Sequence, residues 1–237
     1  MKCEMHGLSH FTPPTSHSDQ DVEAQSSTAE RTLDRPVVVV GLGNPGMEYV
    51  WTPHNAGFMA IDRIALQQGI AVQNRRCKAL TGTTSLAGRQ VILAKPETYM
   101  NERGLSVAAL VREFQITPED RGQRLIVLYD ELDLPLGTMK IKERGSAAGH
   151  NGARSVSAAL GGHEWLRVRI GVGPEFTEAQ KAAGAGRRGG RDYLLDPMRK
   201  ADLGILDEVL DRVAMAVRMI VDLGPAAAMN EFNRSRD

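Results

Sequence analysis

The chain has 237 residues, with 29 basic and 29 acidic side chains that give a formal net charge of zero. This length suits one α/β domain with a full core, or at most two small domains, and the zero charge means that an anionic partner must meet a local basic patch. Two distant cysteines, Cys3 and Cys77, argue against a disulfide framework or a zinc site, and no apolar run is long enough to span a bilayer.

The first segment of the chain differs in composition from the rest. Residues 1–35 are rich in Ser, Thr, His, Gln and acidic residues and contain few large apolar residues, which predicts a disordered tail. The acidic residues argue against a mitochondrial presequence, which is normally rich in Arg and poor in acid. We therefore expect a cytoplasmic protein, with a mitochondrial location left open by the tail, and one folded domain over residues 36–237.

The folded part begins with an uninterrupted β-branched run at residues 37–40, which is typical of a strand buried on both faces. A glycine turn follows, and Thr52-Pro53 indicates a helix start with Thr as the N-cap and Pro at the first helical position. Residues 91–94 predict the next strand. Apolar side chains in residues 107–114 recur at helical spacing and predict an amphipathic helix.

Later elements continue this alternation. Further strands are expected at residues 125–129, 138–144 and 166–172, and further helices at residues 156–160 and 206–220. Residues 177–191 are rich in Ala, Gly and Arg and indicate a mobile loop. The alternation predicts a single α/β domain with a twisted, mixed, mostly parallel sheet that is covered by helices and contains one hairpin.

A histidine and an aspartate form the first candidate site. His54 lies in the first turn of the helix that Thr52 begins, where free N–H groups disfavour the imidazolium form. A neutral imidazole can take a proton from water, as a general base must. Asp130, at the end of the strand at 125–129, could hold the other ring nitrogen. The alternative is that His54 is an ordinary capping or core histidine.

Three asparagines form a second set, at Asn44, Asn101 and Asn151. Carboxamides can donate to a developing oxyanion and can also bind sugar hydroxyls. The alternative is structural, because Asn101 could cap the helix that runs to residue 114 and Asn44 could serve its own Asn-Pro-Gly turn. Capping does not exclude a role in a pocket.

A basic strand is the third feature. Lys140, Lys142 and Arg144 alternate with other residues, so they share one face of the strand at 138–144. A glycine-containing turn that ends at His150 follows them. Cations and close backbone approach predict a phosphate site, and the alternative is a solvated strand face.

A glycine pattern raises an alternative of another class. Gly41-x-Gly43-x-x-Gly46 follows a strand, as in dinucleotide-binding oxidoreductases. The acid at the expected offset, Asp62, falls inside a helical pattern instead of at the end of a second strand. The next expected strand also begins too late for a compact βαβ unit, so the pattern is more typical of a tight strand-to-helix turn.

Together, these segments resemble the bacterial-type peptidyl-tRNA hydrolase family. The motifs are GLGNPGMEYVWTPHNAGF, KPETYMNERG, LIVLYDELDLPLG, GSAAGHNGARSV and LRVRIGVG, in family order and spacing. The resemblance covers nearly everything after the tail. It implies a single-domain α/β enzyme, without metal or organic cofactor, that cleaves the ester between a peptide and the 3′ ribose of tRNA. It also implies a monomer.

The resemblance assigns roles to individual residues. His54 matches the catalytic base, Asp130 the carboxylate that holds it, and Asn44, Asn101 and Asn151 the substrate-positioning asparagines. The matches on the tRNA and pocket side are Tyr49, Tyr99, Met100, Lys140, Lys142 and, more loosely, His150 and Arg169.

The sequence departs from the family pattern at two places near the site. Pro53 stands where the family often has Arg, and Glu102-Arg103 replaces a commoner Leu-Ser pair. Neither departure is expected to touch a matched catalytic group. A rival interpretation is an RNA-binding relative that keeps the fold without hydrolysis, but a pure binder need not retain His54 and Asp130.

Overall fold

The computed structural model describes residues 35–174 and 190–234. The tail predicted for residues 1–35 therefore lies outside the described residues, except for Arg35, and so does most of the loop predicted at 177–191.

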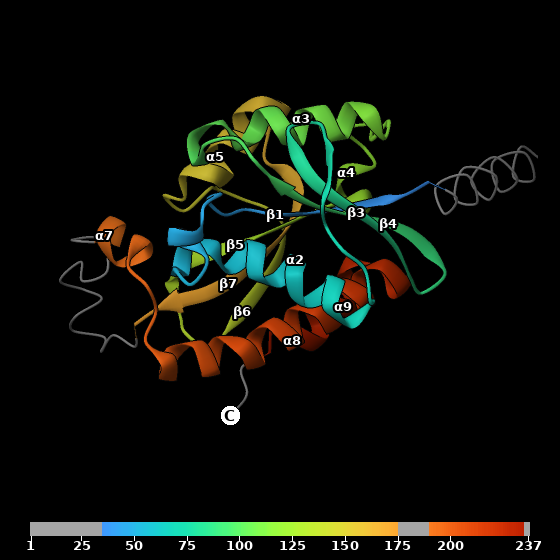
Figure 1. Cartoon of the computed structure of the whole chain (residues 1–237). Helices are drawn as coiled ribbons and strands as arrows, with labels where there is room; N and C mark the ends of the chain where they lie inside the picture. The colour runs from blue at the N-terminus through green and yellow to red at the C-terminus, as the bar shows by residue number, and fades with distance from the viewer. Residues whose placement is uncertain (1–34, 175–189, 235–237) are drawn as a thin grey trace, which may run out of the picture. The chain divides into compact units, whose positions relative to one another are not determined.

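One sheet of seven strands forms the centre of the described part (Figure 1). Its spatial order is β2-β3-β4-β1-β5-β7-β6. The strands are β1 (Val37–Gly41), β2 (Asn74–Arg76), β3 (Ala79–Leu86), β4 (Arg89–Pro96), β5 (Leu125–Pro135), β6 (Met139–Arg144) and β7 (Glu164–Gly173). The four central strands β4, β1, β5 and β7 are parallel, and β2, β3 and β6 run antiparallel to their neighbours. The mixed sheet predicted from the sequence is confirmed.

Helices cover both faces of this sheet, with α3, α4 and α5 on one face and α2, α8 and α9 on the other (Figure 1). The α-helices are α2 (Ala56–Gln67), α3 (Arg103–Glu113), α4 (Arg121–Arg124), α5 (Asn151–Leu160), α7 (Gly190–Leu195), α8 (Lys200–Leu223) and α9 (Pro225–Phe232). Three short 3₁₀ turns are η1 (Met47–Tyr49), η2 (Pro53–Asn55) and η3 (Met100–Glu102). None of the helices in the described residues is long and apolar enough to cross a membrane.

Two apolar layers result from this arrangement, one on each face of the sheet. Val37 and Val39 of β1 face α2 and α8, whereas Val38 and Val40 face α3 and α5. All four valines are fully buried. A strand buried on both faces is therefore a continuous apolar run, as the sequence predicted for residues 37–40.

The sequence missed one part of the sheet. Strands β2 and β3 were not predicted, because β3 contains the polar run Thr81-Gly82-Thr83-Thr84-Ser85 instead of an apolar run. Main-chain pairing with β4 over the whole length of β3 holds it in place. The sheet consequently has three antiparallel pairings where one hairpin was expected.

Candidate active site

The candidate site lies where the central parallel strands end. Gly41, the last residue of β1, pairs with Leu128, so Asp130 extends two residues beyond the end of β1. The sequence predicted that the strand would end at residue 129, whereas β5 continues to Pro135 because β7 still pairs with it. Side chains near the carboxyl ends of parallel strands commonly form binding sites in open α/β sheets.

Close packing of two glycines brings the turn that carries His54 to this edge. A Cβ on Gly57, in the first turn of α2, would overlap the carbonyl oxygens of Leu42 and Leu128. A Cβ on Gly41 would overlap the carbonyl oxygen of Gly57. Helix α2 therefore packs directly on the backbones of β1 and β5, and η2, just before it, lies beside Asp130.

Two histidines bind one oxygen of Asp130. His54 Nδ1 and His150 Nε2 each lie 2.9 Å from Asp130 Oδ1. Asp130 is 1% exposed and His150 is 8% exposed. The second carboxylate oxygen, Oδ2, is buried without a hydrogen-bond partner among the described residues. Both ring nitrogens that face the carboxylate must donate, because the ionised carboxylate has no proton to give.

The protonation of the two rings follows from these bonds. His150 Nδ1 accepts the backbone N–H of Ala153 at 3.1 Å, so the proton of a neutral His150 lies on Nε2 and is donated to Asp130. His54 donates from Nδ1, which leaves its Nε2 as the acceptor. A general base needs this tautomer, with an open nitrogen on the opposite side of the ring from the orienting carboxylate.

The pKa of His54 is shifted in the opposite direction from the one that the sequence led us to expect. The helix start was expected to disfavour the imidazolium form of His54. Burial does act in that direction, but the charge and the hydrogen bond of Asp130 outweigh it, and the pKa of His54 is raised. Burial would raise the pKa of Asp130, yet the two histidines lower it well below its ordinary value. Asp130 therefore remains ionised beside His54.

Thr52 and Pro53 begin this turn as the sequence predicted, with Thr52 at the N-cap and Pro53 in the first helical turn. Thr52 precedes η2, but its hydroxyl does not cap the helix and donates instead to the carbonyl oxygen of Tyr49 at 2.9 Å. The helix start is a 3₁₀ turn over Pro53–Asn55, followed by α2.

Asn44 is held from two sides. Its backbone N–H donates to Asn55 Oδ1 at 2.6 Å, and its carbonyl accepts from Asn55 Nδ2 at 3.0 Å. Its side-chain oxygen accepts from Arg103 Nη2 at 3.3 Å. The expectation that the Glu102-Arg103 departure touches no matched site residue is therefore wrong. Sequence analysis assigned no role to Asn55 or Arg103. The position of Asn55 directly after His54 was nevertheless a signal that could have identified Asn55.

Comparison with known proteins identifies a family for this chain. The family model described as peptidyl-tRNA hydrolase matches residues 38–237. The chain belongs to the peptidyl-tRNA hydrolase family. A peptidyl-tRNA hydrolase of Acidobacterium capsulatum is 58% identical over 197 residues, which are 83% of this chain and 95% of that protein. One from Koribacter versatilis is 51% identical over 83% of this chain and 92% of its own.

Solved structures of the family share the fold. A crystal structure of peptidyl-tRNA hydrolase from Acinetobacter baumannii is 31% identical and covers 84% of this chain and 95% of its own, with a TM-score of 0.71. An Arg119Gln variant of the Acinetobacter enzyme gives a TM-score of 0.72 at 30% identity, over 86% of this chain and 97% of its own.

Several of the other residues matched to the family lie on η1, η3 and α5. Met100 and Asn101 belong to η3, which contacts α5, the helix that Asn151 begins. Met100 is buried, whereas Asn101 and Asn151 are exposed. Tyr99 is 77% exposed, and Tyr49 in η1 is half-buried. Arg154 donates to Asn151 Oδ1.

Glycine backbones lock η3 against the start of α5. A Cβ on Gly104 would overlap the carbonyl oxygen of Ser155, and Gly104 N–H donates to Ser155 Oγ at 3.0 Å. A Cβ on Gly152 would lie 2.7 Å from Met100 Sδ. The turn that carries Met100 and Asn101 and the helix that begins after His150 therefore form one packed unit.

The alternation predicted for the basic strand holds at Lys140 and Lys142, whereas the register shifts before Arg144. Lys140, Lys142 and Arg144 of β6 are exposed, and Lys140 pairs directly with Arg169 of the neighbouring strand. Arg169 differs from the lysines, because it forms an ion pair with buried Glu131. Its charge is thus partly compensated within the protein, whereas Lys140 and Lys142 make no ion pair with the described residues.

The glycine pattern after β1 does not form a dinucleotide site. A Cβ on Gly43 would lie 2.6 Å from the ring of Phe58, and Gly41 meets Gly57, so both glycines serve packing of the protein on itself. The polypeptide then continues into antiparallel β2 and β3 instead of a second parallel strand. Both observations argue against the oxidoreductase interpretation.

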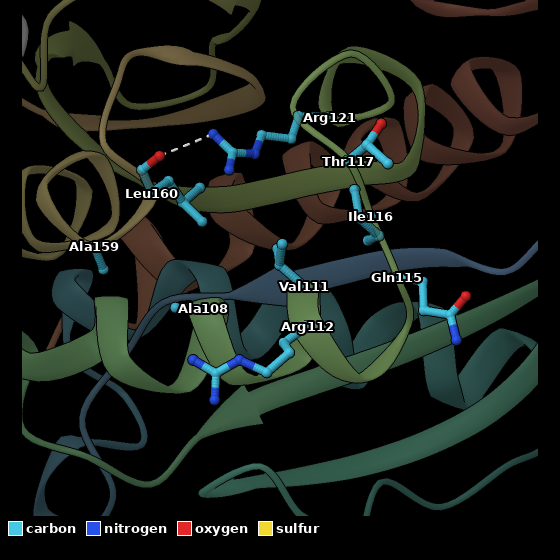
Figure 2. Close-up of a pocket in the computed structure, with 9 residues that line it drawn as sticks. All are labelled: Ala108, Val111, Arg112, Gln115, Ile116, Thr117, Arg121, Ala159 and Leu160. Carbon is cyan, nitrogen blue, oxygen red and sulfur yellow. Dashed lines mark hydrogen bonds between the residues drawn. The ribbon is translucent and has the colours of Figure 1, made fainter.

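Two hollows in the described part of the chain have different surroundings. A groove of about 680 Å³ begins at Asn44 and Asn55 and runs between α2 and the first half of α8, with Trp51 and Phe58 in its wall. A second hollow, of about 360 Å³, lies at the far ends of α3 and α5, where Arg121 donates to the carbonyl oxygen of Leu160 (Figure 2). Only the first adjoins the candidate site.

Proposed function

We propose that this chain hydrolyses the ester bond between a peptide, or an N-blocked amino acid, and the 3′ ribose of tRNA. The reaction would recycle tRNA from peptidyl-tRNA that is released prematurely during translation. The observation that carries the proposal is the Nδ1–H of His54 directed at the buried carboxylate of Asp130, with the opposite ring nitrogen left as an acceptor. We further propose the cytoplasm as the site of action, since its relatives are bacterial proteins and the substrate is a product of the ribosome.

In this mechanism His54 Nε2 takes a proton from a water molecule as the water oxygen attacks the ester carbonyl. A C–O bond forms, and the negative charge moves to the carbonyl oxygen. When this intermediate collapses, the bond to the ribose 3′ oxygen breaks, and the imidazolium returns the proton to that oxygen. The products are a tRNA with an intact 3′ hydroxyl and a free peptide, whose new carboxylic acid releases its remaining proton to solvent.

Asp130 has two roles in this scheme. It fixes the tautomer of His54, and its charge stabilises the imidazolium that forms in the transition state. His150 supports it as a second donor to the same oxygen at 2.9 Å. We therefore assign His150 to positioning of Asp130 instead of the looser tRNA-side role that the family resemblance implied, because both of its ring nitrogens bond to the protein.

The asparagines and the basic strand place the substrate. Asn44, Asn101 and Asn151 offer amide groups to the ester and the peptide backbone, and the groove beside Asn44 has the size of a ligand site. Lys140 and Lys142 receive the 5′ phosphate at the end of the acceptor stem. Tyr49, Tyr99 and Met100 border the 3′ end, and Arg169 adds a weaker contact because Glu131 partly compensates its charge.

The test is cleavage of an N-blocked aminoacyl-tRNA, with and without chelator. His54, Asp130 and His150 place three potential metal-binding atoms within 4.8 Å of one another, so the chelator arm addresses metal dependence directly. We expect cleavage that chelator does not change, and a loss of about a hundredfold or more in turnover for His54→Ala with tRNA binding retained. Binding without cleavage by the parent protein would favour the rival RNA-binding function.

A further inference from the structure

Arg103 is a buried cation beside the candidate site. It is the first residue of α3, directly after the η3 turn, and its side chain is 0% exposed. No carboxylate among the described residues pairs with it. Burial lowers its pKa to about 10, so the guanidinium remains charged at neutral pH. A buried charge without a counter-ion costs several kcal/mol (roughly, after relaxation), and packing alone does not require it.

The contacts of Arg103 connect β4 to Asn44. Nη1 donates to the carbonyl oxygen of Pro96 at 2.6 Å, and Nη2 donates to Asn44 Oδ1 at 3.3 Å. Nε is buried with no partner among the described residues. The Phe58 ring, with its centroid 5.8 Å from Cζ, provides only weak compensation for the charge. The charged end of the side chain is thus directed at Asn44.

These contacts fix the orientation of the Asn44 amide. A guanidinium can only donate, so the Asn44 atom that faces Arg103 must be Oδ1 and the amide nitrogen must point the other way. Asn55 holds the Asn44 backbone on both its N–H and its carbonyl. Within residues 35–174 and 190–234, Asn44 Nδ2 donates to no protein atom. It is therefore a fixed donor available to a ligand.

We propose that Arg103 is a positioning residue that orients Asn44 and strengthens its Nδ2–H as a donor to the substrate carbonyl oxygen on which negative charge develops. This inference rests on the proposed function and adds to it a residue to which the sequence assigned no role. Withdrawal of electron density at Oδ1 by a cation polarises the amide and makes its N–H groups stronger donors. A fixed donor of this kind contributes mainly to turnover, because it acts on charge that appears in the transition state.

The charge of Arg103 also reaches His54. It is one of the groups that lower the His54 pKa, and it acts against Asp130. Its removal should therefore raise the His54 pKa further. Turnover requires neutral His54, so the acid limb of the pH profile should move to higher pH. This shift reports the loss of the Arg103 charge, which a change that only loosened the packing would not remove. The role of Arg103 through Asn44 is tested separately by kcat in the double variant.

The decisive variants are Arg103→Met, Asn44→Ala and the double variant, assayed on N-blocked aminoacyl-tRNA. Met keeps the length of the buried side chain and removes its charge and donors. We expect Arg103→Met to lower kcat at least tenfold with little change in KM and to move the acid limb to higher pH. In the Asn44→Ala background the same change should cost little more, because the two residues act as one unit.

Two further variants guard against misfolding as an explanation. Arg103→Lys keeps the charge and one donor nitrogen. Compared with Arg103→Met, it should recover part of the lost kcat and leave the acid limb near that of the parent. Arg124 provides a control, since it is also fully buried and binds the backbone oxygens of Pro36, Phe114 and Gln115 at the other end of the sheet, although unlike Arg103 it also pairs with a carboxylate, that of Asp120. Arg124→Met should lower the melting temperature without moving the acid limb.

The outcomes separate the two proposals. A parent protein that fails to cleave N-blocked aminoacyl-tRNA overturns the proposed function. A parent that cleaves it while Arg103→Met keeps the parental kcat overturns only the role of Arg103. Full additivity of the losses in Arg103→Met and Asn44→Ala would also overturn that role, because it would mean that Arg103 does not act through Asn44.

Discussion

The rings of His54 and His150 lie with their centroids 5.0 Å apart, and both donate to the same buried oxygen. One ring is partly open to solvent, and the other is buried against the start of α5. His150 therefore fixes the position of Asp130, and Asp130 in turn fixes the ring of His54. The position of His54, the proposed base, thus depends on both residues.

The pH dependence of the reaction should reveal the charge of Asp130. Because Asp130 raises the His54 pKa, activity of the parent should fall as the pH drops through that raised value. Asp130→Asn removes the charge, so the acid limb should move to lower pH while kcat falls at least tenfold. Profiles of kcat/KM against pH for both proteins check this. An unmoved limb in the variant would assign the limb to another group.

A change at His150 can separate its two hydrogen bonds. Asn is a good N-cap, so His150→Asn should still accept the Ala153 N–H but should be too short to reach Asp130. We expect kcat to fall about tenfold and unfolding free energy to fall by about 1–3 kcal/mol, because the buried carboxylate of Asp130 loses a donor. His150→Ala, which loses both bonds, should be less stable than His150→Asn. Full activity in His150→Asn would make the bond to Asp130 irrelevant to turnover.

Removal of the two exposed lysines should affect binding of the tRNA end and not the chemistry. In Lys140→Ala/Lys142→Ala, KM for full-length substrate should rise, and its dependence on salt should become shallower. A minimal substrate without the 5′ phosphate should be cleaved nearly as well as by the parent, because the phosphate contact does not reach the ester. Equal losses on both substrates would instead indicate that the strand is a solvated face.

Because α2 packs directly on the sheet, one methyl group added at Gly57 should lower both stability and activity. In Gly57→Ala the new Cβ would overlap the carbonyl oxygens of Leu42 and Leu128, so α2 and the η2 turn must shift away from Asp130. We expect a loss of about 1–3 kcal/mol in unfolding free energy and a lower kcat. Gly204→Ala in α8 is the control, since its Cβ would have nothing within 4 Å. Thermal unfolding and turnover of both variants check the difference.

Much of the fold could be predicted from the sequence, because the parallel strands are buried on both faces. A strand such as β1 has to be apolar throughout, and such runs are easily recognised. Strand β3 escaped prediction for the opposite reason. Its Thr and Ser side chains carry no apolar pattern, and its position follows from main-chain pairing with β4, which leaves no trace in composition.

The site could be predicted in part. His54 and Asp130 stood out because each follows a strand, and ends of neighbouring parallel strands meet at one edge of the sheet. The second bond to Asp130 could not be predicted, since it depends on how the turn before α5 folds back over the sheet. Arg103 was hidden as well, because an arginine at the start of a helix is ordinarily exposed.

The backbone contact between Gly104 and Ser155 has a consequence for inhibitors. The turn that presents Met100 and the helix that begins after His150 share a main-chain contact, so one cannot swing away from the other without breaking it. A small molecule that contacts Met100 therefore meets a wall of fixed shape. Affinity for this wall should depend on rigid complementarity, and flexible compounds should gain little from induced opening.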